Sequence, residues 1–222
     1  MENSYILPLK QAFLQASNAK EATAMQKYMK NNFIYFGIKS PQRKLICKEF
    51  LALQGLPNYE NLAKVIRILW QQPEREYQYF AIELLDKFTK QFDNKIIILL
   101  EELITQKSWW DSVDLLASHH VAAYFKKYPE TMQDITARWM ESQNIWLQRT
   151  CLIFQLLYKK ETDVGLLFEY IRCCSDSKEF FIQKAIGWAL RQYAKTDSQI
   201  VLKFVKENNL KPLSKREALK HF

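Results

Sequence analysis

The sequence predicts an all-α protein on the basis of two observations, its low content of Gly and Pro and the helical spacing of its apolar residues. Gly and Pro together account for 10 of the 222 residues, against about 12% in average usage, so turn formers are too few for a sandwich or barrel of short strands. Apolar residues recur at helical spacing along almost the whole chain, and no stretch alternates β-branched with polar residues. These features favour helices joined by short connections.

Turn-forming and capping residues indicate where the helices begin, in chain order. Prolines stand early in several helices, where the missing N–H is harmless, and serine or threonine precedes others as an expected N-cap. The prolines are Pro8, Pro41, Pro57, Pro73 and Pro129, and the expected caps are Ser40, Ser108, Thr196 and Ser214. With the apolar periodicity, they predict helices over 5–16, 19–31, 41–53, 59–72, 74–91, 95–105, 109–127, 130–142, 145–158, 162–174, 178–194, 197–208 and from 215 onward.

An internal repeat orders these helices. The segments EYQYFAIELL, WDSVDLLASH, WLQRTCLIFQ and FIQKAIGWAL align at a spacing of 35 residues, which places Tyr79, Asp114, Arg149 and Lys184 at one repeat position. A period of 35 filled by two helices is typical of an α-solenoid, in which equivalent positions line one face. We therefore expect about six helical pairs in a single domain over residues 1–222, although the first third fits this register poorly.

The charge is unevenly distributed. The chain carries a net charge of +8, divided as +4 over residues 1–94, −2 over 95–143 and +6 over 144–222. Basic ends could hold a phosphate backbone, while the acidic middle could hold a cationic group. The alternative is that these charges only solvate the outer faces of the helices.

Several classes of protein are excluded. The longest uninterrupted apolar run has five residues, at 96–100, far below the roughly 18 to 20 that a membrane span needs. The first residues lack the features of a secretory signal, so we expect a cytosolic protein. The four cysteines form no CxxC motif, and we expect neither a metal nor a cofactor.

Candidate chemistry lies in the segment SWWDSVD. Trp110 and Asp114 are four positions apart and share a helix face, whereas Trp109 and Asp111 are expected to point elsewhere. Trp110 could equally be a core aromatic. Asp114 is harder to explain as a purely structural residue, because Asp has poor helix propensity in the middle of a helix.

The next repeats add cations and a second tryptophan. Arg149 could form an ion pair with Asp114 across one repeat or contact a phosphate, because its planar fork suits both anions. Trp188 follows Lys184 by four positions on the same face. Gly187 either leaves room for something to approach closely or accommodates helix packing.

Longer blocks of the sequence carry a family resemblance. The blocks YMKNNFIYFGI, SWWDSVD, IWLQRT, SKEFFIQKAIGWALRQYAKT and PLSKREALKH closely resemble the AlkD family of bacterial alkylpurine DNA glycosylases, from about residue 5 to the C-terminus. The resemblance implies HEAT-like repeats that form a curved, concave DNA-binding surface. It also implies base excision repair of duplex DNA by hydrolysis of the N-glycosidic bond of N3- and N7-alkylated purines, such as 3-methyladenine and 7-methylguanine. No metal, cofactor or lyase step is implied, and a monomer suffices for such a surface.

The resemblance also assigns roles to residues. The residues that match the family's catalytic set are Trp110, Asp114, Arg149 and Trp188, and those implied at the DNA surface are Tyr28, Lys39, Ser40, Lys44, Phe180, Phe181, Lys184 and Arg191. The chain departs from the family pattern at Lys39, Ser40 and Lys44, where an amide, a threonine and an arginine are expected. It also has Leu157 near an expected phosphate-contacting lysine.

These residue types suit glycosidic hydrolysis. An alkylated purine is already cationic and leaves as a neutral base, so no general acid is needed, and Asp114 would stabilise the oxocarbenium ion and orient water. Lys184 could instead form a Schiff base, although base release does not require one. The alternatives to an enzyme are a non-catalytic HEAT-like protein that binds DNA and a scaffold that binds an acidic protein.

Overall fold

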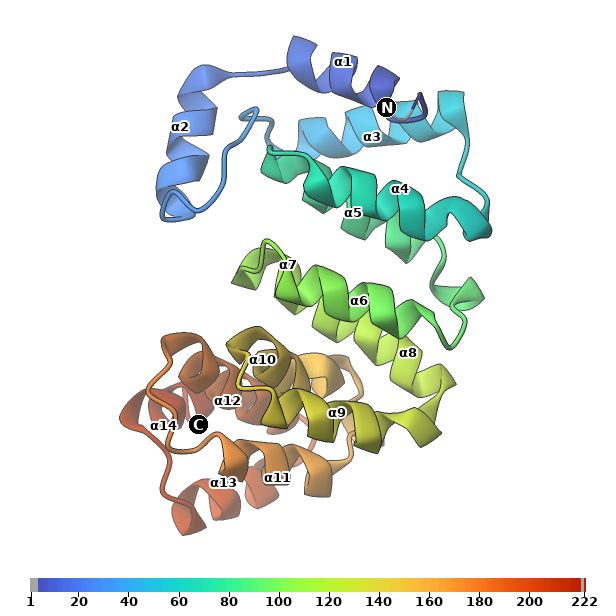
Figure 1. Ribbon diagram of the computed structural model, residues 1–222. Coiled ribbons are helices and arrows are strands. Elements are labelled where there is room, and N and C mark those ends of the chain that lie inside the picture. Colours follow the sequence, from blue (N-terminus) through green and yellow to red (C-terminus); the bar gives the residue numbers. More distant parts are fainter. Residues whose placement is uncertain (1–3, 221) are drawn as a thin grey trace. The chain divides into compact units, whose positions relative to one another are not determined.

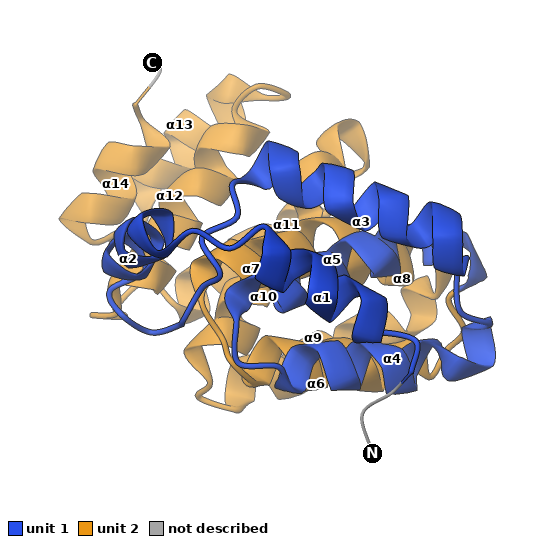
Figure 2. Cartoon of the chain, turned by 90° about the horizontal axis from the view of Figure 1, so that it is seen from above, with its two compact units in different colours: residues 1–91 blue, residues 92–222 orange. Residues whose placement is uncertain are grey.

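The structure, a computed structural model that describes residues 4–220 and 222, consists of helices and connecting turns (Figure 1). Within those residues, β-type pairing is limited to an isolated bridge between Ile34 and Glu74. The chain forms two compact units, residues 1–91 and 92–222 (Figure 2). The all-α prediction is confirmed, whereas a single domain with a concave surface stays a prediction.

The first unit is held by aromatic packing between its helices. The rings of Phe13, Phe36 and Tyr77 contact one another at centroid distances of 5.3 to 5.7 Å, which joins the first helix, the loop before the third and the fifth. The helices are α1 (Leu7–Gln15), α2 (Ala19–Tyr28), α3 (Ser40–Gln54), α4 (Tyr59–Gln71) and α5 (Arg75–Asp86), followed by a 3-10 turn, Thr89–Gln91.

A buried carboxylate fixes the loop between α2 and α3. Glu76 of α5 accepts hydrogen bonds from the backbone N–H groups of Phe36, Gly37 and Ile38 at 2.9 to 3.2 Å. Burial raises the pKa of Glu76, and these backbone donors oppose that rise. Gly37 has φ +84°, and a Cβ there would lie 2.2 Å from the carbonyl oxygen of Asn18, so only glycine fits.

The second unit contains the remaining helices. One of them is continuous from residue 110 to 127, because α7 and α8 are joined by a π-helical segment, Leu116–Val121. The helices are α6 (Ile96–Thr105), α7 (Trp110–Leu115), α8 (Ala122–Lys127), α9 (Met132–Glu141), α10 (Ile145–Ile153), α11 (Val164–Cys173), α12 (Phe180–Tyr193), α13 (Ser198–Glu207) and α14 (Pro212–Ala218). Short 3-10 turns span Pro129–Thr131, Phe154–Leu157 and Lys159–Glu161.

Helices of the second unit pack in successive pairs. Helix α10 contacts α9 and α11 as well as α7 and α12, and α12 in turn contacts α13 and α14. Contacts between neighbouring pairs join residues about one repeat apart, such as Lys126 with Glu161, 35 residues on, and Thr136 with Tyr170, 34 residues on. The 35-residue helical repeat is therefore confirmed in this unit.

The expected helix ends are less accurate than the helices themselves. Side chains that cap helices are Asn18, Asn144, Asp163 and Asp197. The four predicted caps are wrong: Ser40 lies inside α3, and Asp197 caps α13 in place of Thr196. Ser108 and Ser214 instead donate hydrogen bonds to the carbonyl oxygens of Ile104 and Gln183. The last helix begins at Pro212, three residues earlier than expected.

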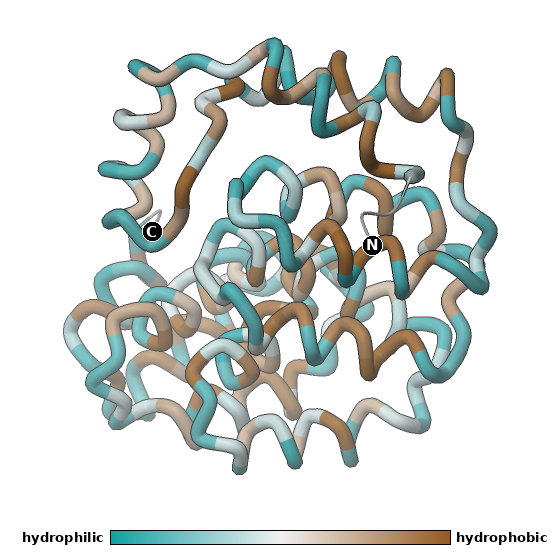
Figure 3. Tube along the Cα trace, turned by 45° about the horizontal axis from the view of Figure 1, so that its top comes forward, coloured by the Kyte–Doolittle hydropathy of each residue, from teal (hydrophilic) through white to brown (hydrophobic). Residues whose placement is uncertain are grey.

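Hydropathy alternates along the helices in both units. Hydrophobic and hydrophilic stretches follow one another within the same helix (Figure 3), as expected for helices that bury one face and expose the other. Among the described residues, no helix is both long and apolar enough to cross a membrane.

Candidate functional site

The centre of the candidate site is an ion pair between Asp114 of α7 and Arg149 of α10. The Nε and Nη2 atoms of Arg149 donate to the two carboxylate oxygens of Asp114, at 2.7 and 2.8 Å. Such a bidentate pair fixes both position and orientation. The residues are 35 positions apart, so the ion pair across one repeat, which the sequence left open, does form.

The pair is largely buried. The side chain of Asp114 is 16% exposed and that of Arg149 is 5% exposed. Burial raises the pKa of Asp114, and the hydrogen bonds from Arg149 oppose this rise. Arg149 thus stabilises the ionised form of Asp114 in a largely buried environment, where an unpaired charge would be strongly disfavoured. A small part of the Asp114 side chain stays accessible to solvent.

An aromatic cluster supports the pair. The rings of Trp109, Trp146 and Phe181 contact one another at centroid distances of 5.0 to 5.8 Å. The Nη1 atom of Arg149 also donates to the carbonyl oxygen of Phe181, which links α7, α10 and the first turn of α12. Trp109, which was expected to point away from the face shared by Trp110 and Asp114, lies just before α7, and its ring packs against rings of α10 and α12. Trp146 was missed, although it lies one helical turn before Arg149.

The other predicted residues of the site lie on the same helices. Trp110 begins α7, one turn before Asp114, and Trp188 is half-buried on α12. Phe180 is 58% exposed, and its ring packs edge-on against Phe181 at a centroid distance of 5.4 Å. The site therefore presents an exposed aromatic ring next to the half-buried cluster of Trp109, Trp146 and Phe181.

Lys184 and Arg191, two cations predicted to contact DNA, both pair with Glu217, an acid that was not among the predicted site residues. Both lie on α12, and each pairs with the carboxylate at 3.0 Å. Lys184 holds the same repeat position as Asp114 and Arg149. Glu217 follows Lys184 by 33 residues, close to one repeat, and this spacing could have identified Glu217 from the sequence. The pKa of Glu217 is lowered by its hydrogen bonds with Lys184 and Arg191.

Gly187 explains how α14 reaches this position. A Cβ at Gly187 would lie 2.3 Å from the Cβ of Glu217 and 2.9 Å from the carbonyl oxygen of Ser214. The group that approaches Gly187 closely is therefore α14 of the same chain. Helix packing accounts for this glycine.

Metal ligands do not gather in the described residues. Within 4–220 and 222, no group of three or more His, Cys, Asp or Glu side chains is arranged to hold a metal ion. The groups of the site that could act on a ligand are the Asp114 carboxylate, the Arg149 guanidinium and the neighbouring aromatic rings.

The chain is similar to proteins of a known family over nearly its whole length. Residues 9–222 match the family described as DNA alkylation repair enzyme. The chain belongs to this family. The match covers both compact units, and it confirms the resemblance seen in the sequence at the level of DNA alkylation repair.

A solved structure supports the same assignment. The predicted DNA alkylation repair enzyme from Enterococcus faecalis has a TM-score of 0.86 and 36% sequence identity, over 93% of this chain and 96% of that one. No curated protein matches. Membership in the DNA alkylation repair enzyme family gives the chain a role as an enzyme in the repair of alkylated DNA.

In this member of the family, the remaining predicted DNA-contacting residues lie in the first unit. Tyr28 ends α2 and is 69% exposed. Lys39 precedes α3 and pairs with Glu21 at 2.9 Å, and Ser40 and Lys44 are exposed on α3. Each of these side chains is accessible within its own unit.

Proposed function

We propose that the chain is a monofunctional DNA glycosylase that hydrolyses the N-glycosidic bond of cationic N3- and N7-alkylated purines in duplex DNA. The observation that carries the proposal is the buried, bidentate pair of Asp114 with Arg149 beside the aromatic cluster. A carboxylate held in this way suits a reaction in which positive charge develops on a sugar.

Asp114 supplies the negative charge in this mechanism. The alkylated purine leaves as a neutral base, while the deoxyribose becomes an oxocarbenium ion. At about 4 Å and an effective dielectric constant near 20, one carboxylate stabilises such a cation by about 4 kcal/mol, or on the order of 10³ in rate. The same oxygens can orient the attacking water.

Arg149 acts as a positioning residue. A carboxylate has about four sites that accept hydrogen bonds, and Arg149 occupies one on each oxygen of Asp114. The other sites stay available to water or sugar. Arg149 also favours the ionised carboxylate, which opposes the effect of burial.

The two tryptophans of the family set complete the site. Trp110 and Trp188 hold the cationic sugar and base by packing and cation–π contacts, each contributing roughly 0.5 to 2 kcal/mol. The exposed rings of Tyr28 and Phe180 pack against the nucleic acid. The cations Lys39, Lys44, Lys184 and Arg191 contact phosphate, which makes binding sensitive to salt.

The contacts of Lys184 favour hydrolysis without a lyase step. A Schiff base requires a lysine amine that is free to attack the sugar, whereas the Nζ of Lys184 is held by the Glu217 carboxylate at 3.0 Å. Lys184 is therefore better suited to binding phosphate than to attacking the sugar.

The proposal is tested with duplex DNA that contains 7-methylguanine. Released base is measured for the wild type, for Asp114→Asn and for the matched control Asp111→Asn, which makes the same change on the same helix. We expect Asp114→Asn to lose on the order of 10³ in single-turnover rate and the control to keep most activity. Equal rates for the wild type and Asp114→Asn would remove Asp114 from the mechanism. Tight binding of DNA by the wild type without any base release would identify a non-catalytic DNA-binding protein.

A further inference from the structure

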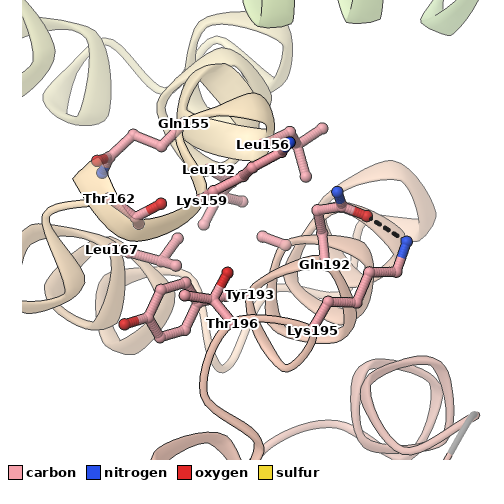
Figure 4. Close-up of a pocket in the computed structure, with 11 residues that line it drawn as sticks. Leu152, Gln155, Leu156, Lys159, Thr162, Leu167, Gln192, Tyr193, Lys195 and Thr196 are labelled. Atoms are coloured by element: carbon pink, nitrogen blue, oxygen red, sulfur yellow. Dashed lines mark hydrogen bonds between the residues drawn. The ribbon is translucent and has the colours of Figure 1, made fainter.

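Two adjoining cavities lie in the second unit. One has a volume of about 190 Å³ and opens between the 3-10 turns that follow α10, the start of α11 and the end of α12 (Figure 4). The other, of about 570 Å³, shares Lys159, Lys195 and Thr196 with it. Lys195 follows Phe181 by 14 residues, roughly 20 Å along a helix, so the rim at Lys195 lies well away from the Asp114 site. The inner wall begins nearer to it, because Leu152 follows Arg149 by three residues and Ala189 follows Trp188 by one.

The inner wall of the smaller cavity is apolar. Leu152, Leu156, Leu167 and Ala189 line it, together with Tyr193. An apolar cavity of about 150 Å³ holds a benzene ring, so this volume suits a planar ring that is partly inserted and partly exposed.

The rim of the cavities is basic. Lys159 and Lys195 border both of them, and Lys126 and Lys160 border the larger one. Among the lining residues described, the acidic side chain is Glu161, and it pairs with Lys126 at 2.5 Å. The lysines therefore outnumber the acids, and the rim attracts an anion.

The smaller cavity also offers directed polar groups. Lys195 is oriented by a 2.8 Å hydrogen bond from its Nζ to the Gln192 side chain (Figure 4). Thr162 and Thr196 contribute hydroxyl groups to the lining. Lys159 has φ +54°, a backbone conformation that is unusual for lysine.

We infer that the two cavities bind a nucleotide, with its base in the apolar cavity and its phosphate on the lysine rim. Lysines near helix C-termini also offset the helix dipole, which explains the cations but not the apolar cavity between them. The nucleotide could be a free mononucleotide or one unit of a single DNA strand, because both present the same base and phosphate.

Calorimetry on the full chain tests the inference with adenosine 5′-monophosphate, adenosine, inorganic phosphate and a single-stranded oligomer of five deoxyadenosines. We expect the mononucleotide to bind at least about tenfold tighter than adenosine or phosphate alone, and to bind more weakly as salt rises. An oligomer that binds more tightly still and is displaced by the mononucleotide identifies a strand as the source. Weaker binding of the oligomer identifies the free nucleotide.

Variants at the rim provide the matched control. Combining Lys159→Gln with Lys195→Gln should weaken mononucleotide binding by about tenfold or more. Combining Lys203→Gln with Lys206→Gln removes the same charge from α13, outside both cavities, and should leave binding unchanged. Equal binding by the two double variants, or phosphate binding as tightly as the mononucleotide, would overturn the inference. So would loss of 7-methylguanine release in the Lys159 and Lys195 double variant, because the lysines would then belong to the duplex surface.

Discussion

Each compact unit contains an arginine paired with a carboxylate on another helix, and the two pairs differ in geometry. In the second unit, two nitrogens of Arg149 bind the two oxygens of Asp114. In the first unit, one nitrogen of Arg43 binds one oxygen of Glu83 at 2.8 Å. The Nε of Arg43 is buried and has no hydrogen-bond partner among the residues that the structure describes, whereas that of Arg149 binds Asp114.

The difference follows from the residue that occupies the repeat position. Tyr79, one repeat before Asp114, offers a ring instead of a carboxylate, and the Arg43 guanidinium lies 4.6 Å from its centroid. Arg43 pairs with another residue of α5, Glu83, which follows it by 40 residues, whereas Asp114 precedes Arg149 by 35. A similar helix-to-helix contact thus serves as a packing device in one unit and as a candidate reaction centre in the other.

The largest expected difference concerns catalysis. Asp114→Asn should lower release of 7-methylguanine on the order of 10³-fold, whereas Glu83→Gln should change it by less than about threefold. The reason is that the Asp114 carboxylate faces the developing cation in the proposed mechanism. Single-turnover rates at saturating enzyme measure both. Similar losses in the two variants would show that the two ion pairs act alike.

The second difference concerns stability. Arg149→Met leaves the more deeply buried acid without a partner and should lower the free energy of unfolding by about 3 to 5 kcal/mol. Arg43→Met should lower it by less, because the Glu83 side chain is 29% exposed and can be hydrated. Urea denaturation gives both values. Adding Asp114→Leu to Arg149→Met should restore much of the lost stability, and a double variant no more stable than Arg149→Met would contradict this account.

A smaller effect is expected where α14 meets α12. Gly187→Ala forces a methyl group against Glu217 and Ser214 and should lower the free energy of unfolding by about 1 to 3 kcal/mol. Gly165→Ala on α11 is the control. Its added Cβ would lie 3.4 Å from the nearest atom, a side-chain oxygen of Asp163, so it should be neutral or stabilising by up to about 1 kcal/mol. Thermal unfolding separates these outcomes, and equal shifts would exclude the close approach of α14.

The smallest effect should depend on pH. The pKa of Glu217 is lowered in the folded chain, so its ion pairs stabilise the fold above the unfolded pKa of about 4.3 and lose this contribution as pH falls through the folded value. Glu217→Gln should therefore lower the free energy of unfolding by about 1 kcal/mol near pH 7 and by much less at the acid end. Urea denaturation of both proteins at several pH values measures the difference in their free energies of unfolding. A difference that grows toward low pH would contradict a lowered pKa of Glu217 in the folded chain.

Much of the fold could be predicted because it depends on local patterns. Apolar spacing located the helices, since a helix buries one face whatever it packs against. The 35-residue register put Asp114 and Arg149 at the same position of successive repeats, which made an ion pair between them one of two alternatives, because each helical pair of a repeat stacks on the one before it. The predicted caps failed for two reasons. Asp197 takes the role expected of its neighbour Thr196, and the helices near Ser40, Ser108 and Ser214 begin at other residues than the capping pattern indicated.

The all-α chain, its repeat and the line of residues that includes Asp114, Arg149 and Lys184 could be inferred from the amino-acid sequence alone. The packing of the helices sets what those side chains contact: Arg149 binds both oxygens of Asp114, and Lys184 and Arg191 share Glu217. It also brought Trp109 and Trp146 together around Phe181. Periodicity fixes which face of a helix a residue occupies, whereas the partner on that face depends on how neighbouring helices pack.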